Sequence, residues 1–254
     1  MPGRPSTTPL AEPTDPTQIA TKTHFYTTGA VPAVQCVVPR KLVQTRSGML
    51  AYSRVLIGCM QRAWQPSVLR IGYQLDVPRV DAYSVGSSPT AAPLCDYRPS
   101  ESDGYYVAQS KTICFDWKQL VDKDPVWAAL QLQFTVAHEF GHHLQATVGI
   151  LRSFEFAHAG GSAAVQLEDN RRMELQASCF GAAFLGANKK AFKYSGTRFR
   201  VWQYLVEHTG DEYGPKNVRD HGSRKNHGYW SLRAFAAADP KVCNTFTAPA
   251  AKVS

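Results

Sequence analysis

The chain of 254 residues is long enough to bury a sizeable hydrophobic core, as one large domain or as two small ones. Hydrophobic residues make up 44% of it and charged residues 19%, as in ordinary globular proteins, and no apolar run approaches the roughly 18 residues of a membrane-spanning helix. The net charge is +8, but the lysines and arginines are scattered. This argues against specific nucleic-acid binding and leaves an anionic cell-wall polymer or a membrane surface as a partner for the basic surface.

The first half of the chain is predicted to contain a linker, one helix and several strands. Residues 1–22 are rich in proline and threonine and predict a disordered linker, which leaves residues 23–254 as a single domain. Apolar residues recur at helical spacing over residues 46–64, and Pro66 is expected to end this helix. The segments VLRIGYQLDVP and VDAYSV predict strands, and YYVAQSKTICFDW predicts a hairpin that turns at residues 109–111.

The second half is predicted to be mainly helical. Asp124 and Pro125 are typical of a helix start, and Gly149 is expected to follow the end of this helix. The stretch FAHAGGSAAVQ is interpreted as a loop, and further helices are expected over residues 170–188, 197–208 and 223–238. Strands first and helices later predict an α+β domain, with a strand-rich N-terminal part and a mainly helical C-terminal part.

Six cysteines are spread along the chain without a CxxC pair or a metal-like cluster. An even number in this arrangement favours disulfides in an oxidising compartment over buried free thiols in the cytosol. Sequence alone does not choose the connectivity, and we predict pairing between neighbours: Cys36 with Cys59, Cys95 with Cys114, and Cys179 with Cys243. The N-terminus lacks the apolar core of a signal peptide, so we expect a secreted or cell-envelope protein whose signal or anchor lies upstream of this sequence.

The stretch TVAHEFGHHLQ, residues 135–145, indicates a metal site. His138 and His142 are four residues apart, so a helix presents both imidazoles on one face, as a zinc ion requires. Glu139 points away from the metal and can act as a general base, which is the HExxH arrangement. His143 falls off the metal-facing side and is expected to support the site or to lie at the surface. The alternative is a helix whose histidines are only hydrogen-bonded within a core.

Two histidines need a third zinc ligand from elsewhere in the chain. Glu174 lies on the apolar side of its predicted helix, where an unpaired carboxylate is costly to bury and a metal ion would compensate its charge. The alternative is an exposed glutamate paired with Arg171. Glu168 and Asp169 are interpreted as acids of a helix start. Two histidines and one glutamate leave a fourth position open, as in a catalytic zinc site.

Four stretches, AHEFGHHLQ, RRMELQASCF, DHGS and DPKVCNTF, resemble the neutral zinc metallopeptidase family of bacteria, whose pattern reads HExGHH-Q, ELQADC, HG and a CNTF-like end. The resemblance covers about residues 34–246, with specific motifs only in the second half. It implies a zincin-like domain of the gluzincin type, with His138, His142 and Glu174 as zinc ligands and Glu139 as base. One position departs from the pattern: Ser178 stands where the family has an aspartate.

The expected function is that of a zinc-dependent peptidase that hydrolyses peptide bonds through a metal-bound water, with Glu139 as general base. The oxyanion that forms on the substrate needs a further donor, for which His221 and Tyr213 are candidates. We prefer His221, at the family's HG position; the alternative is that it is a structural histidine of a loop. The hairpin strand before the HExxH helix is expected to pair with an extended peptide.

Two other functions stay open. One is a secreted, cell-wall-associated zinc-binding protein of the same fold without turnover, which the serine at position 178 and the basic composition favour. The other is a cytosolic, DNA-associated protease, which requires reduced cysteines. Because a serine is a weaker partner than a carboxylate for a ligating histidine, we predict weaker zinc binding unless Asp169, Asp220 or a carbonyl fills that role.

Overall fold

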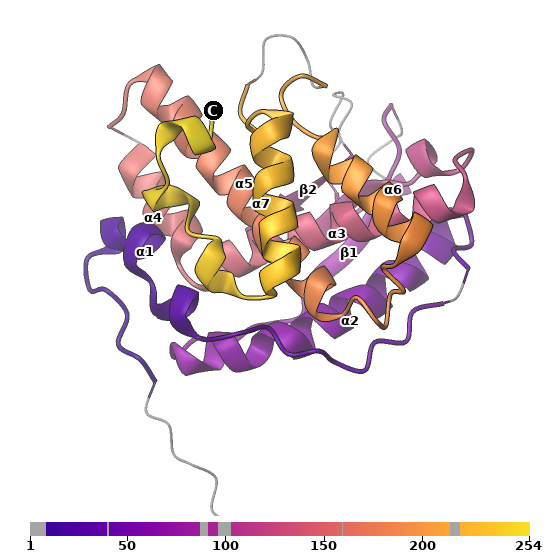
Figure 1. Ribbon diagram of the computed structural model, residues 1–254, viewed down its shortest axis with the longest axis horizontal. Coiled ribbons are helices and arrows are strands. Elements are labelled where there is room, and N and C mark those ends of the chain that lie inside the picture. The colour runs from indigo at the N-terminus through magenta and orange to yellow at the C-terminus, as the bar shows by residue number, and fades with distance from the viewer. Residues whose placement is uncertain (1–8, 40, 87–90, 96–102, 159, 214–218) are drawn as a thin grey trace, which may run out of the picture.

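A computed structural model of the protein describes residues 9–39, 41–86, 91–95, 103–158, 160–213 and 219–254. The structure is 58% helical with one small sheet, which agrees with the predicted α+β class. The helices and strands are α1 (Ile19–Lys22), α2 (Arg46–Arg70), β1 (Arg79–Tyr83), β2 (Gly104–Val107), β3 (Thr112–Asp116), α3 (Pro125–Thr147), α4 (Ile150–His158), α5 (Ala163–Ala187), α6 (Gly196–Glu207) and α7 (Arg224–Ala237) (Figure 1). Short 3₁₀ segments lie before and after α1, between β3 and α3, and after α7.

The sheet has the strand order β1-β3-β2. β2 and β3 form the predicted antiparallel hairpin, and Lys111 in its turn adopts a left-handed conformation with φ of 48°. β1 pairs parallel to β3. β2 therefore lies at an edge of the described sheet, where it packs against α3.

Three of the predicted helices are confirmed as α3, α6 and α7. The start of α3 shows why Asp124 and Pro125 predicted this helix start correctly. The Asp124 carboxylate accepts hydrogen bonds from the backbone N–H groups of Val126 and Trp127, at 2.9 and 3.0 Å, and Pro125 occupies the first turn. A helix start leaves its first backbone N–H groups without partners. The Asp124 carboxylate accepts from two of them, and Pro125 has no N–H group to satisfy.

The N-terminal part of the domain is not strand-rich, contrary to the prediction. α2 continues through Pro66 to Arg70, so the predicted helix end is wrong. The segment VLRIGYQLDVP is helical at its first residues and forms no strand, so that strand prediction is wrong, whereas β1 confirms the strand predicted at VDAYSV. Pro66 leaves the carbonyl of Arg62 without its helical donor, but both residues are exposed, so water can hydrate that carbonyl. Trp64 and Val68 are buried on the opposite side, and their packing outweighs the missing hydrogen bond.

Two further predictions are wrong at their boundaries. α4 begins directly after Gly149, and α5 begins at Ala163 instead of residue 170, so most of FAHAGGSAAVQ is helical. The predicted linker over residues 1–22 lies partly outside the described residues. Within it, residues 16–22 fold into a 3₁₀ turn and α1, Ile19 is buried, and the Ala20 N–H donates to Ser153 Oγ at 3.0 Å. The linker prediction therefore fails for residues 16–22.

α3 and α5 cross in backbone contact, and this crossing positions the site. A Cβ atom added to Gly141 of α3 would lie 2.3 Å from the Ala177 carbonyl oxygen of α5. A Cβ atom added to Gly181 of α5 would lie 2.7 Å from the Ala137 carbonyl oxygen of α3. Only glycine permits this approach. α2 packs on α3, and α7 packs on α5 (Figure 1).

The three predicted disulfides, Cys36–Cys59, Cys95–Cys114 and Cys179–Cys243, are all present. They are typical of a protein from an oxidising compartment outside the cytoplasm. Cys179–Cys243 joins α5 to the segment after α7. Among the described residues, no helix combines the length and the apolar character that crossing a membrane requires.

Candidate metal centre and active site

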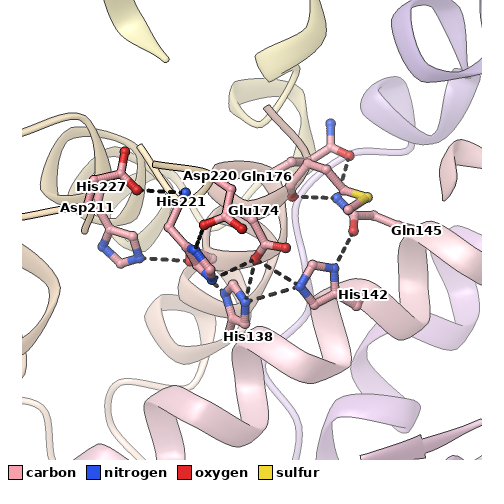
Figure 2. A network of polar contacts seen from close by, with 11 residues as sticks. His138, His142, Gln145, Glu174, Gln176, Asp211, Asp220, His221 and His227 are labelled. Atoms are coloured by element: carbon pink, nitrogen blue, oxygen red, sulfur yellow. Dashed lines mark hydrogen bonds and ion pairs between the residues drawn. The ribbon is translucent and has the colours of Figure 1, made fainter. Parts of the chain in front are cut away.

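Three side chains from two helices converge on one point. His138 and His142 of α3 meet Glu174 of α5, and all three side chains are mostly buried (Figure 2). His138 Nε2 and His142 Nε2 lie 3.1 Å apart, and Glu174 Oε2 lies 3.1 Å from the first and 3.2 Å from the second. The crossing of α3 and α5 thus brings together the three ligands that the sequence predicted. They form a group that can hold a metal ion, the candidate metal-binding group.

The hydrogen bonds of Gln145 fix the proton position on His142. The Gln145 amide nitrogen donates to the Met173 carbonyl oxygen at 2.8 Å and to Gln176 Oε1 at 3.1 Å, which sets the orientation of the amide. Gln145 Oε1 must then accept from His142 Nδ1, 2.9 Å away. A neutral imidazole with its proton on Nδ1 carries a lone pair on Nε2. The lone pair of His142 therefore points toward the centre of the group (Figure 2).

A longer chain of hydrogen bonds fixes the proton position on His138. The Val206 carbonyl oxygen can only accept, so His227 donates to it from Nδ1 at 2.8 Å, and a neutral His227 accepts at Nε2. Burial lowers the pKa of His227 to about 4, so this ring is neutral at physiological pH. Ser178 Oγ therefore donates to His227 Nε2 at 2.9 Å and accepts from His138 Nδ1 at 2.8 Å. The lone pair of His138 is left on Nε2, also directed at the centre.

The group as a whole requires a positive charge at its centre. Two imidazole lone pairs and a carboxylate oxygen lie within 3.2 Å of one another, where they repel unless a proton or a metal ion lies between them. Burial opposes protonation of His142, but Glu174 outweighs it and raises the pKa of His142 to about 9. Tetrahedral zinc with bonds of about 2.0–2.1 Å separates its ligand atoms by about 3.3 Å, close to these distances. The donor set fits zinc.

Glu139 lines a cavity of about 320 Å³ together with His138 and Glu174. Its side chain is only 4% exposed, and Oε2 has no hydrogen-bond partner among the described residues. Burial raises the pKa of this carboxyl, against the opposing effect of the neighbouring histidines. Gly104, at the start of β2, lines the same cavity, and a Cβ atom there would lie 2.6 Å from Thr135 Cγ2 and 3.3 Å from Glu139 Oε1. The cavity thus contains a buried carboxylate of raised basicity beside the metal-binding group.

A family model described as "Putative neutral zinc metallopeptidase" matches residues 14–197. The chain belongs to this family. The matched residues include the three members of the metal-binding group and Glu139, whereas His221 and His227 lie beyond them. This assignment agrees with the resemblance that the sequence motifs indicated.

The chain is similar to two bacterial proteins whose names state no activity. The chain is 23% identical over 209 residues to "Uncharacterized protein YpfJ" of Escherichia coli strain K12. This alignment covers 77% of this chain and 70% of that protein. The chain is also 26% identical over 226 residues to "Uncharacterized protein Rv2575" of Mycobacterium tuberculosis strain H37Rv. This alignment covers 73% of this chain and 66% of that protein. No solved structure matches the chain.

His221, the predicted oxyanion donor, lies at the rim of the metal-binding group of this zinc metallopeptidase family member. Its Nε2 is 3.7 Å from Glu174 Oε2, and its Nδ1 is 2.6 Å from Asp220 Oδ1 (Figure 2). Burial acts to lower the pKa of His221, but Asp220 and Glu174 outweigh it and raise that pKa to about 9. The other candidate, Tyr213, also lines the cavity, and its hydroxyl accepts from Arg224 Nη1 at 3.2 Å.

His143 is neither a surface residue nor part of the metal-binding group. It is 1% exposed, its Nε2 donates to the Asp76 carbonyl oxygen at 2.9 Å, and its Nδ1 accepts from the Tyr106 hydroxyl at 2.8 Å. It therefore ties α3 to β2 and to the segment before β1. The prediction of a surface position is wrong, because the sequence did not show that β2 covers this side of α3.

Sequence reasoning missed two residues that set the proton positions of the imidazoles. Gln145 is three residues after His142, so helical spacing alone placed it on the same face, and this signal was available. His227 is 49 residues from Ser178, and no spacing rule connects them. Only the packing of α7 on α5 brings them together.

Proposed function

We propose that this protein is a zinc-dependent peptidase in which His138, His142 and Glu174 hold the zinc ion and Glu139 is the general base. The observation that carries the proposal is the convergence of two lone pairs and a carboxylate oxygen beside the buried carboxylate of Glu139, whose Oε2 has no hydrogen-bond partner among the described residues. Membership in the zinc metallopeptidase family supports the reaction class.

A zinc ion held by His138, His142 and Glu174 would supply Lewis-acid chemistry: it would lower the pKa of a water molecule toward neutrality and polarise the substrate carbonyl. Glu139 accepts the proton of the attacking water and passes it to the leaving amine. Burial raises the pKa of Glu139, which makes the carboxylate a stronger base than an exposed glutamate and suits both transfers. Asp220 holds Nδ1 of the His221 imidazole, and an N–H group at Nε2 can donate to the oxyanion on the substrate.

The arrangement of the elements supports a zincin-like domain of the gluzincin type. The two histidines stand one turn apart on α3, and the glutamate comes from α5, the second helix after it. β2 lies at the edge of the described sheet, and Gly104 of this strand lines the cavity. Pairing of an extended peptide with this edge stays a prediction, as does a location in the cell envelope. The three disulfides support an oxidising compartment.

The test combines zinc analysis with hydrolysis of an unbiased peptide library. The parent is expected to contain about one zinc ion per chain and to cleave peptides, whereas Glu139→Gln keeps the zinc but loses turnover by at least about 100-fold, because an amide cannot accept the proton. Glu155→Gln is the matched control, since Glu155 is exposed on α4. A parent with full zinc and no cleavage would favour the zinc-binding protein without turnover. Equal cleavage by the Glu139 variant would contradict the mechanism.

A further inference from the structure

A second hollow, of about 240 Å³, shares no lining residue with the metal-site cavity. It is formed by the segment before α2, by Tyr52 of α2, by the first half of α3, by the connection between α5 and α6, and by Arg198 in the first turn of α6. Its polar lining includes Lys41, Lys193 and Arg198, and no aspartate or glutamate of the described part of the chain lines it. Three cations around one hollow attract an anion.

Arg198 has an unused donor at this place. Its Nε atom is buried and has no hydrogen-bond partner among the residues that the structure describes. A buried guanidinium N–H without an acceptor is costly, and such a group calls for an acceptor that the chain itself does not provide. Asp124 directly precedes the part of α3 that lines the hollow. Its carboxylate already accepts hydrogen bonds from the backbone N–H groups of Val126 and Trp127.

The Tyr52 hydroxyl is a second donor without an acceptor among the described residues, and Tyr52 and Tyr194 share the side-chain amide of Gln133. The Tyr194 hydroxyl donates to Gln133 Oε1 at 2.6 Å, and Gln133 Nε2 donates to the Tyr52 hydroxyl oxygen. The hydroxyl proton of Tyr52 is thus left without an acceptor among the hydrogen bonds of the described residues. Burial raises the pKa of Tyr52, so the proton stays on the oxygen. Tyr52 and Gln133 both line the hollow.

We propose that this hollow binds an oxyanion, the carboxylate or phosphate group of a small organic molecule, through Arg198, the Tyr52 hydroxyl and the ammonium groups of Lys41 and Lys193. A guanidinium presents its N–H groups in a planar fork that matches the oxygens of a carboxylate or a phosphate. Apolar side chains, including Leu42 and Phe192, line the rest of the hollow and provide a place for a short hydrocarbon part of the ligand.

The binding test does not use peptidase activity, so its result is independent of the proposed function. Inorganic phosphate, acetate and hexanoate are titrated into the zinc-loaded protein by calorimetry at constant ionic strength set with chloride. The parent is expected to bind at least one of them saturably at one site per chain. Tighter binding of hexanoate than acetate identifies a carboxylate with an apolar tail, and tighter binding of phosphate than of either identifies a phosphate group. Either result supports the site when the Arg198 variant weakens the binding, because a zinc ion held at the metal site also binds carboxylates and phosphate.

Two variants locate the bound anion. Arg198→Gln is expected to weaken binding at least tenfold, and Tyr52→Phe, which keeps the ring, to weaken it several-fold and serves if the arginine variant does not fold. Arg200→Gln is the matched control, because Arg200 is exposed on the same helix and its guanidinium donates to Thr197 Oγ1 at 2.9 Å. The proposal is overturned if the parent binds none of the three anions, or if the Arg200 variant loses as much affinity as the other two.

Discussion

Ser178 and His227 are 49 residues apart in the sequence, yet Ser178 Oγ and His227 Nε2 lie 2.9 Å apart in the interior. On its other side Ser178 Oγ accepts from His138 Nδ1 at 2.8 Å. Ser178 is the position where the family pattern has an aspartate, and a lone hydroxyl is an ambiguous partner because it can donate as well as accept. His227 removes the ambiguity, because its Nε2 accepts the hydrogen bond that the Ser178 hydroxyl donates. In this chain, two neutral groups therefore orient His138, one of the proposed zinc ligands.

The hydrogen-bond chain from His138 to His227 predicts the behaviour of two variants. Without the His227 acceptor, the Ser178 hydroxyl can donate to His138 Nδ1, which favours the tautomer with a proton on Nε2 and so blocks metal binding. We expect His227→Phe and Ser178→Ala each to weaken zinc binding by about 10- to 100-fold in a chelator competition.

Because both residues act through one chain of hydrogen bonds, the double variant should be little weaker than either single variant. Ser231→Ala is the control, since Ser231 is a fully buried serine of α7 whose Oγ has no partner among the described residues. It should leave zinc affinity unchanged. Fully additive losses in the double variant would show that Ser178 and His227 act separately.

Zinc removal is predicted to destabilise the fold as well as abolish turnover. A zinc ion held by the proposed ligands would bridge α3 and α5, and binding to the native state alone stabilises by about 2.7 kcal/mol when free zinc is 100-fold above its Kd. The melting temperature should therefore fall when a chelator is added and recover when zinc is returned. In His142→Ala, which lacks one of the proposed ligands, the melting temperature should no longer depend on zinc. A melting temperature of the parent that ignores both zinc and chelator would contradict a bound ion at this crossing.

The site was more predictable from the sequence than the fold around it, for a physical reason. His138, His142 and Glu139 are set by the geometry of one helix, and the Asp124 cap and the β2–β3 hairpin are equally local. Pro66 within α2 and the buried position of His143 depend on contacts that close only in the folded protein. Local propensity gives no access to such contacts. The three disulfides and Glu174 join distant segments, and they were predicted from residue type, from neighbour pairing and from motif resemblance, not from local geometry.

The disulfide between Cys179 and Cys243 is predicted to be the most stabilising of the three. Both residues are fully buried, and the bond closes a sequence separation of 64 residues, against 19 for Cys95–Cys114. In the chain-entropy model these loops correspond to about 4 and about 3 kcal/mol. Denaturant unfolding of the two double alanine variants should give this order. Equal losses would show that native-state packing, which differs between the two bonds, dominates over loop closure.

The contact of Gly141 with Ala177 is predicted to control both stability and metal binding. A Cβ atom at position 141 would lie 2.3 Å from the Ala177 carbonyl oxygen, so α3 and α5 must separate to admit it. We expect Gly141→Ala to cost about 1–3 kcal/mol in the free energy of unfolding, as overpacking does, although alanine is the better helix former. Because the separation moves Glu174 away from His138 and His142, zinc affinity should fall as well.

Gly160 offers the matched control for this substitution, because a Cβ atom there would meet nothing within 4 Å. Gly160→Ala should change neither the free energy of unfolding nor the zinc affinity beyond a few tenths of a kcal/mol. Denaturant unfolding and chelator competition on the two variants measure both quantities. If Gly141→Ala is as stable as the parent but loses zinc, the crossing can widen without strain, and the close approach serves the metal site alone. If it keeps both, the helices are not held at this distance in solution, and the convergence of the three ligands does not depend on glycine at position 141.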